Sequence, residues 1–371
     1  MKNLKWIMVL ILCTAMLAGC AKKADDTLSA PEGTQKEDVT PIPEPISDTP
    51  DNSNETDVEE KTEPAPEATA APAEKLDIKI AALKGPTAIG MIKIMEDASL
   101  KTAANNYEFT IAGTADEITA GLIKGDFDIA AIPCNLASVL YNKTEGKIKL
   151  AGINTLGVLY IVETGDSIRT VEDLKGKTIY STGLGTTPQY TLNYLLNSFG
   201  IDPEKDVTIE YKAEATEVAA ILSEAENAVA MLPQPYVTTV MMSNDKIRVA
   251  LDVAKEWDNI SKDKSSVVTG VVVVRKEFLE ESPEAFQAFL EEYRLSADYV
   301  NTDIDGASVL VEKFDIFKAA PIKKAIPYCN ITLITGDEMK TKVGGYLQTL
   351  FDQNPQSVGG KLPAEDFYYL P

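Results

Sequence analysis

The feature that most constrains the fold is a regular alternation of strand-like and helix-like segments, which starts at residue 77 and restarts near residue 177. Short apolar runs such as 127–132 are typical of strands that are covered on both faces. Segments such as 187–199, which stops at a glycine, have the pattern of helices. Strands that alternate with helices in this way predict open α/β sheets.

The alternation also predicts two lobes, because two similar blocks are followed by a mostly helical C-terminal quarter. The predicted strands are 76–83, 107–113, 127–132, 148–153, 157–162, 177–180, 207–211, 228–232 and 267–274. The predicted helices are 86–104, 114–124, 135–142, 187–199, 217–226 and one that begins near Ser282. Ligands of open α/β sheets bind beyond the carboxyl ends of the strands, so the segments that follow the strands are the candidates for a site.

The N-terminus has the pattern of a targeting signal. Two lysines precede a mostly apolar stretch at 6–17, which is shorter than the roughly 20 apolar residues of a spanning helix. The stretch ends in Leu17-Ala18-Gly19-Cys20, which resembles the bacterial lipobox. The alternative is an ordinary signal peptide with an incidental cysteine. We expect 1–19 to be a signal peptide and Cys20 to carry lipid, which anchors a chain to a membrane without spanning it.

The segment 20–75 has a different composition, which predicts a disordered tether. After Cys20 it holds eight prolines, no aromatic residue, and five lysines against fifteen acidic residues. Such a segment buries too little apolar surface to offset the loss of chain entropy on folding. An acidic tail that binds a partner is the alternative.

Charge and composition exclude other functions. The whole chain has a formal net charge of −22, and the part after the tether is acidic with no basic stretch, which argues against nucleic acid or anionic lipid as the main partner. Histidine is absent, so triads and zinc sites that need imidazole are excluded. Besides Cys13 and Cys20, the chain has Cys134 and Cys329, which could pair outside the cell or be small buried hydrophobic residues.

Four short motifs, in order along the chain, resemble the nitrate/sulfonate/taurine class of solute-binding proteins, which also includes binders of thiamine precursors. They are Asp126-Phe127-Asp128-Ile129-Ala130-Ala131, Thr170-Val171-Glu172-Asp173-Leu174-Lys175-Gly176-Lys177, Gly200-Ile201-Asp202-Pro203 and Arg275-Lys276-Glu277-Phe278. The resemblance implies an α/β fold of two lobes, the periplasmic-binding-protein type II fold, in which each lobe is a mixed sheet flanked by helices. One lobe would combine 76–163 with 275–371, the other would span 168–268, and the chain would cross near 163–168 and 269–274.

Four loops would then face a cleft between the lobes. The first, Lys84-Gly85-Pro86-Thr87, is either a binding loop or a plain turn. In the second, Pro133-Cys134-Asn135, the Asn135 side chain either only caps a helix or also contacts the ligand. Glycines and hydroxyls in 181–187 suit an anion or a carbonyl group, with a structural turn as the alternative. In 232–236, Gln234 replaces the acid of the family's Pro-Glu-Pro-aromatic stretch, which weakens the case for a cationic ligand.

Single aromatic and hydroxyl residues complete the candidate set. Tyr236 either stacks on a planar solute or belongs to the core, and Trp257 is more often a packed surface aromatic than a ligand contact. Thr269 lies near the second predicted crossover. The candidate ligand-binding residues are Lys84, Gly85, Thr87, Cys134, Asn135, Thr182, Gly183, Gly185, Thr186, Thr187, Gln234, Tyr236, Trp257 and Thr269.

The resemblance implies a binding subunit of an ABC importer, which closes on a small organic solute and passes it to a permease with its ATPase. We expect a monomer on the outer face of the cell membrane, held there only by its lipid, with no cofactor, no metal and no nucleic-acid partner. A sensory or adhesive surface lipoprotein and an enzyme on the same fold are the alternatives. The loops contain no arginine, which favours a neutral or weakly charged heterocycle over a small dense anion.

Overall fold

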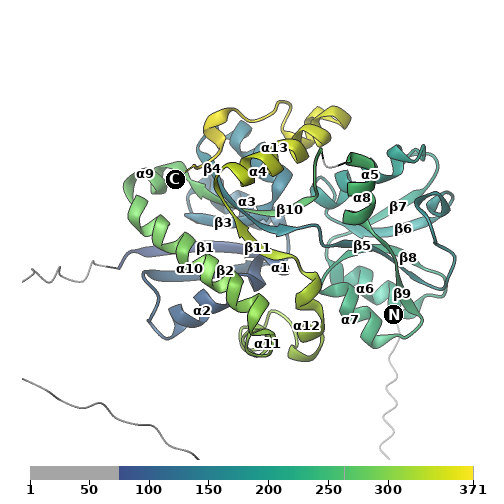
Figure 1. Ribbon diagram of the computed structural model, residues 1–371, viewed down its shortest axis with the longest axis horizontal. Coiled ribbons are helices and arrows are strands. Elements are labelled where there is room, and N and C mark those ends of the chain that lie inside the picture. Colours follow the sequence, from purple (N-terminus) through teal and green to yellow (C-terminus); the bar gives the residue numbers. More distant parts are fainter. Residues whose placement is uncertain (1–74, 263, 371) are drawn as a thin grey trace, which may run out of the picture. The chain divides into compact units, whose positions relative to one another are not determined.

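The computed structural model describes residues 75–262 and 264–370, which belong to one compact unit (Figure 1). The predicted signal peptide, Cys20 and nearly all of the predicted tether lie outside the described residues. No helix within the described residues has the length and apolar character needed to cross a bilayer.

The first sheet has six strands in the order β11-β4-β10-β3-β1-β2. Strand β1 is parallel to β2 and β3, whereas β10 is antiparallel to β3 and β4, and β11 is antiparallel to β4. The bounds are β1 Asp77–Leu83, β2 Asn106–Ala112, β3 Ile129–Pro133, β4 Ile148–Leu156, β10 Val268–Arg275 and β11 Ile331–Ile334.

The second sheet has five strands in the order β7-β6-β8-β5-β9. Strand β6 is parallel to β7 and β8, and β5 is antiparallel to β8 and β9. The bounds are β5 Leu159–Thr164, β6 Thr178–Thr182, β7 Thr208–Lys212, β8 Val229–Pro233 and β9 Ile247–Asp252. Each sheet mixes parallel and antiparallel pairs and is flanked by helices, so the predicted α/β class is confirmed.

Helices cover both faces of each sheet, and the apolar side chains beneath them form four clusters. The helices of the first lobe are α1 Pro86–Ile89, α2 Ile92–Ser99, α3 Ala115–Lys124, α4 Cys134–Lys143, α9 Lys276–Glu281, α10 Pro283–Thr302, α11 Ile304–Lys313, α12 Ala319–Ala325 and α13 Gly336–Gln353. The helices of the second lobe are α5 Thr187–Ser198, α6 Ala215–Glu224, α7 Tyr236–Ser243 and α8 Val253–Ser261. Four 3₁₀ turns are η1 Val171–Leu174, η2 Ile326–Tyr328, η3 Pro355–Val358 and η4 Glu365–Phe367.

The predicted crossovers are displaced. The chain leaves the first sheet at the end of β4 and enters the second at Leu159, so the first crossover is 157–158 rather than 163–168. The second runs between α8 and β10, and 269–274 lies inside β10. The first crossover is earlier than predicted because 159–164 is a strand of the second sheet, and its apolar run fits either sheet. At the observed crossover a Cβ on Gly157 would lie 2.6 Å from the Ala254 Cβ, so only glycine fits there.

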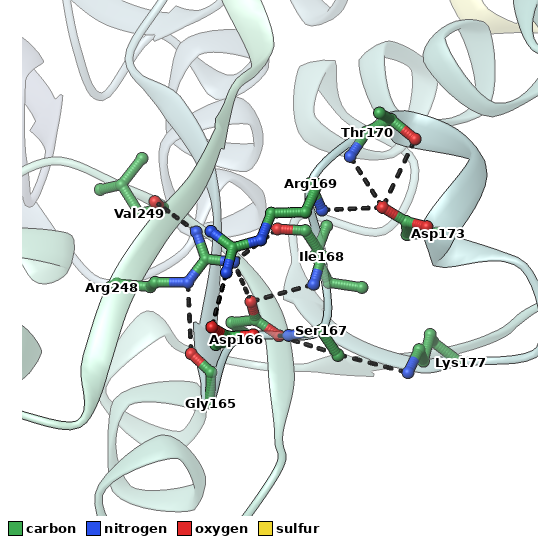
Figure 2. Close-up of polar contacts among 11 residues, drawn as sticks. Gly165, Asp166, Ser167, Ile168, Arg169, Thr170, Asp173, Lys177, Arg248 and Val249 are labelled. Atoms are coloured by element: carbon green, nitrogen blue, oxygen red, sulfur yellow. Dashed lines mark hydrogen bonds and ion pairs between the residues drawn. The ribbon is translucent and has the colours of Figure 1, made fainter.

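Residues 163–168 comprise the end of β5 and the bend that follows it (Figure 2). The buried Glu163 carboxylate accepts hydrogen bonds from the Ile168 and Ser167 backbone N–H groups, both at 3.0 Å, and pairs with Arg248. Burial raises the pKa of Glu163, but the hydrogen bonds from Ile168 and Ser167 and the Arg248 charge outweigh it, so the pKa is below its ordinary value.

Candidate functional site

The carboxyl ends of parallel strands bring the predicted loops to one edge of each sheet. In the first lobe, β1 and β3 run parallel and end at Leu83 and Pro133, directly before two of the loops. In the second lobe, β6 and β8 run parallel and precede the other two. Helices α1, α4, α5 and α7 begin at these ends, as expected for a ligand site of an open α/β sheet.

Asn135 joins the loops of the two lobes. Its side chain is fully buried, and Nδ2 donates to the carbonyl oxygens of Gly185 at 3.3 Å and Ser357 at 3.0 Å. Its Oδ1 accepts from the Thr187 hydroxyl at 3.3 Å. The expectation that Asn135 caps its helix is wrong, because Pro133 precedes α4 as the capping residue and no side-chain cap forms. The side chain instead connects the beginnings of α4 and α5.

The glycine-rich loop has two glycines in the left-handed region, and part of its hydrogen-bonding capacity is used internally. Gly183 and Gly185 have φ values of 76° and 75°, which side chains rarely adopt. The Thr186 hydroxyl donates to the Gly183 carbonyl oxygen at 2.8 Å, and the Gly185 N–H donates to Gln189 Oε1 at 2.6 Å. Thr182, the last residue of β6, is half-buried.

The first loop places a cation beside an aromatic ring. The exposed Lys84 Nζ lies 5.8 Å from the centre of the Phe317 ring. Gly85 has φ 146°, and its carbonyl oxygen accepts the Ile89 N–H at 3.0 Å as α1 begins. The buried Thr87 hydroxyl donates to the Leu83 carbonyl oxygen at 2.7 Å.

The fourth loop contacts the same Phe317. The Tyr236 ring packs edge-on against it at 5.1 Å between centres, and Tyr236 is 9% exposed. Burial, followed by the nearby Glu214 carboxylate, raises the pKa of Tyr236 to about 12, so the phenol stays protonated. Gln234 is buried, and its Oε1 accepts from the Thr238 backbone N–H and hydroxyl.

Two predicted residues lie in the core. Trp257 is fully buried, its Nε1 donates to Ser265 Oγ at 3.0 Å, and its ring lies 4.1 Å from Tyr194 and 5.3 Å from Tyr346. Cys134 is buried and free, and burial raises the pKa of its thiol. Cys329 is also free and packs in a different apolar cluster of the first lobe, so no disulfide joins the two.

Polar residues in β4 were missed by the sequence reasoning. Asn154 and Thr155 are buried, and among the described residues the Asn154 amide atoms and the Thr155 hydroxyl have no hydrogen-bond partner. The hydroxyl of Thr269, which was predicted, is also without one. Two adjacent polar residues at the end of a strand that is apolar apart from Lys149 were the signal that could have revealed Asn154 and Thr155.

The charged groups near the loops are few and mixed in sign. The chain has four arginines, and each forms ion pairs away from the four loops. The pairs are Arg169 with Asp166, Arg248 with Glu163, Arg275 with Asp128 and Glu277, and Arg294 with Glu291 and Asp298. Lys84 forms no ion pair within the described residues, and the Glu214 carboxylate lies against Gly113 of the first lobe. No cluster of three metal-ligating side chains occurs in residues 75–262 and 264–370.

A surface pocket of about 510 Å³ lies elsewhere, between α3 and α9. Arg275 and Lys276 line it, at the carboxyl end of β10. This end of β10 pairs with the amino end of β3, which is opposite to the end that precedes the predicted loop. None of the predicted site residues lines it, so the strand-end loops remain the candidate site.

This geometry, with strand-end loops of two mixed sheets in contact, is that of a two-lobed solute-binding protein. Residues 99–304 match the family described as ABC transporter, phosphonate, periplasmic substrate-binding protein, and the chain belongs to it. It is therefore a periplasmic substrate-binding component of an ABC import system, so the predicted kind of solute-binding protein is confirmed.

Solved structures share the fold. An ABC transporter protein from Parabacteroides distasonis is 26% identical, with a TM-score of 0.65 over 79% of this chain and 98% of its own. The periplasmic aliphatic sulphonate binding protein SsuA from Escherichia coli is 15% identical, with a TM-score of 0.64 over 80% and 92%. The alkanesulfonate-binding protein SsuA from Xanthomonas axonopodis is 14% identical, with a TM-score of 0.62 over 79% and 96%. No curated protein matches the chain.

Proposed function

We propose that this substrate-binding protein is a monomeric lipoprotein on the outer face of the cell membrane, which encloses a small organic solute between its lobes and delivers it to a permease and ATPase. The observation that carries the proposal is the buried Asn135 contact with Gly185 and Thr187, because it joins the strand-end loops of both lobes. A solute held between these loops would contact both lobes only when they are closed. Ligand binding would then shift the population toward the closed form.

The site residues proposed for the solute are those of the four loops together with Thr269. A micromolar affinity corresponds to about 8 kcal/mol of binding free energy, which a buried ring contact and a few hydrogen bonds supply. Trp257 takes a supporting role in this proposal, since it is fully buried against Tyr346.

We also propose that the protein binds without chemical turnover and without a cofactor. The family and the solved structures that share the fold are transport binding proteins rather than enzymes. The four loops hold Lys84 but no carboxylate, and histidine is absent from the chain. A sensory or adhesive role is not favoured by the family match.

The binding proposal is tested by a thermal-shift screen of the purified full chain. The probes are sulfonates, nitrate, methylphosphonate, thiamine precursors, riboflavin and amino acids. We expect at least one class to raise the melting temperature, with the compound recovered unchanged. Stabilisation by none, or conversion of a bound probe into a product, would contradict the proposal.

Anchoring is tested separately with Cys20→Ser, which removes the sulfur that would carry lipid. In a bacterial host, we expect labelled fatty acid to enter the wild-type chain but not the variant. Equal labelling of both chains, or no labelling of either, would contradict lipidation at this residue and leave solute binding unaffected.

A further inference from the structure

The polar groups at the end of β4 lie beside the first predicted loop, where both meet Gly270 of β10. A Cβ on Gly270 of β10 would lie 2.5 Å from Asn154 Oδ1 and 2.8 Å from Thr87 Cγ2, so these two side chains converge on the same glycine. Gly270 also pairs with Thr155 in the sheet. The cluster therefore lies next to the loop that begins α1. Its Asn154 is three residues before the first crossover, which starts at Gly157.

These groups lack the partners that buried polar groups normally have. Asn154 is 0% exposed, and neither Nδ2 nor Oδ1 has a hydrogen-bond partner among the described residues. The same holds for the hydroxyls of Thr155 and Thr269. The Tyr293 hydroxyl adjoins the Asn154 amide and also lacks a partner with hydrogen-bonding geometry. Buried polar groups without partners are costly, so a cluster of them indicates a bound molecule that supplies the partners.

The unpartnered atoms specify the chemistry of that molecule. A primary amide offers one acceptor and two donors, and Asn154 leaves both kinds unused. A ligand with an N–H and a C=O side by side satisfies both. The hydroxyls of Thr155 and Thr269 accept or donate according to need.

The charges near the loops agree with a neutral ligand. A small dense anion is bound best by the planar fork of arginine, and all four arginines pair with acidic side chains elsewhere. Lys84 Nζ lies over the Phe317 ring, and the Glu214 carboxylate near Gly113 and Tyr236 adds a negative charge beside the loops.

We infer that the solute is an uncharged compound with a cyclic amide edge, such as a lactam or a pyrimidine base, and that Asn154 binds this edge with help from Thr155 and Thr269. This inference rests on the proposed solute-binding function and adds the chemical class of the solute. It also distinguishes this chain from a phosphonate binder, which is what the family's description names.

The test measures binding of uracil, 2-pyrrolidinone, methylphosphonate and taurine to the full chain by calorimetry. Asn154→Leu removes both polar atoms with little change in volume, and Asn193→Leu on α5 is the control, because Asn193 Oδ1 is also buried without a partner. We expect a cyclic amide to bind the wild type and the control alike, and to bind Asn154→Leu at least tenfold more weakly. The unliganded variant should melt no lower than the wild type.

Among the results in which a probe binds, three would overturn the inference. They are binding of the two anions but not of the cyclic amides, equal affinity of wild type and Asn154→Leu, and a crystal structure of the uracil complex in which only a water contacts Asn154. Binding of either anion would leave solute capture intact, so the failure of this inference is separable from that of the proposed function. Absence of binding by all four probes would also overturn the inference, and the wider screen would then decide the function.

Discussion

Replacing Asn135 with alanine should open the lobes. Of its three hydrogen bonds, those with Gly185 and Thr187 cross between the lobes, and the one with Ser357 stays within the first. Each bond contributes about 0.5–1.5 kcal/mol net. Losing the crossing pair therefore destabilises the closed form by about 1–3 kcal/mol, which lowers the ratio of closed to open molecules by roughly 5- to 150-fold.

Asn142→Ala is the matched control, because it lies on the same helix and binds only the first lobe. Its Nδ2 donates to the carbonyl oxygens of Val358 at 2.9 Å and Lys361 at 2.7 Å. Small-angle scattering of the unliganded full chain measures the radius of gyration, and the segment before the folded part is the same in every variant. We expect Asn135→Ala to increase this radius and Asn142→Ala to lower only the melting temperature.

The reasoning is refuted if Asn135→Ala scatters like the wild type, or if the control expands equally. In the first case the crossing hydrogen bonds would not hold the lobes together. In the second, the expansion would come from loosening the segment around η3, which both side chains contact.

Three further variants probe stability and binding. Glu163→Gln should lower the free energy of unfolding by about 3 kcal/mol at neutral pH, because it leaves Arg248 without its buried partner. The pKa of Glu163 in the folded protein is below its ordinary value of 4.5, so the stability difference between wild type and Glu163→Gln is fully present above about pH 4.5 and shrinks as the pH falls through the folded pKa. Denaturant titrations at several pH values test this dependence. Trp257→Ala should cost about 3–5 kcal/mol of stability by leaving a core cavity, and a smaller loss by calorimetry would contradict full burial. Tyr236→Ala should weaken solute binding by more than about tenfold, whereas Tyr236→Phe should not; unchanged affinity in the alanine variant would refute a ring contact.

The sequence was sufficient for the architecture because apolar runs that are covered on both faces produce a strong local pattern. Strand β3 was predicted at 127–132 and is found at Ile129–Pro133, and α5 begins at Thr187 as expected. The placement of strands in one sheet or the other was not predictable locally. The runs around β5 and β10 are equally apolar in either sheet, so the crossovers were misplaced by several residues.

The site was predicted in part for a similar reason. Ligand-binding loops follow the carboxyl ends of strands, and this rule was enough to predict Asn135, Thr187 and Tyr236 from local sequence. Their partners were not predictable, because Phe317 lies far along the chain in a region with no motif. Asn154 was not predicted because it lies inside a strand rather than in a loop, and only the tertiary structure brings it close to Thr87.

The two sets of contacts between the lobes differ in burial, and this difference indicates how the protein opens. On one side, Thr191 of α5 shares a 2.8 Å hydrogen bond with the Tyr346 hydroxyl, and Trp257 packs beside the same fully buried tyrosine. On the other side, Tyr236 meets Phe317, which is only partly buried, next to the exposed Lys84. Local opening is easiest where few apolar contacts are buried. The Phe317 side should therefore separate first, and full opening also requires loss of the α5 contacts with Asn135 and Tyr346. Trp257→Ala should then affect unfolding, and Tyr236→Ala should affect binding.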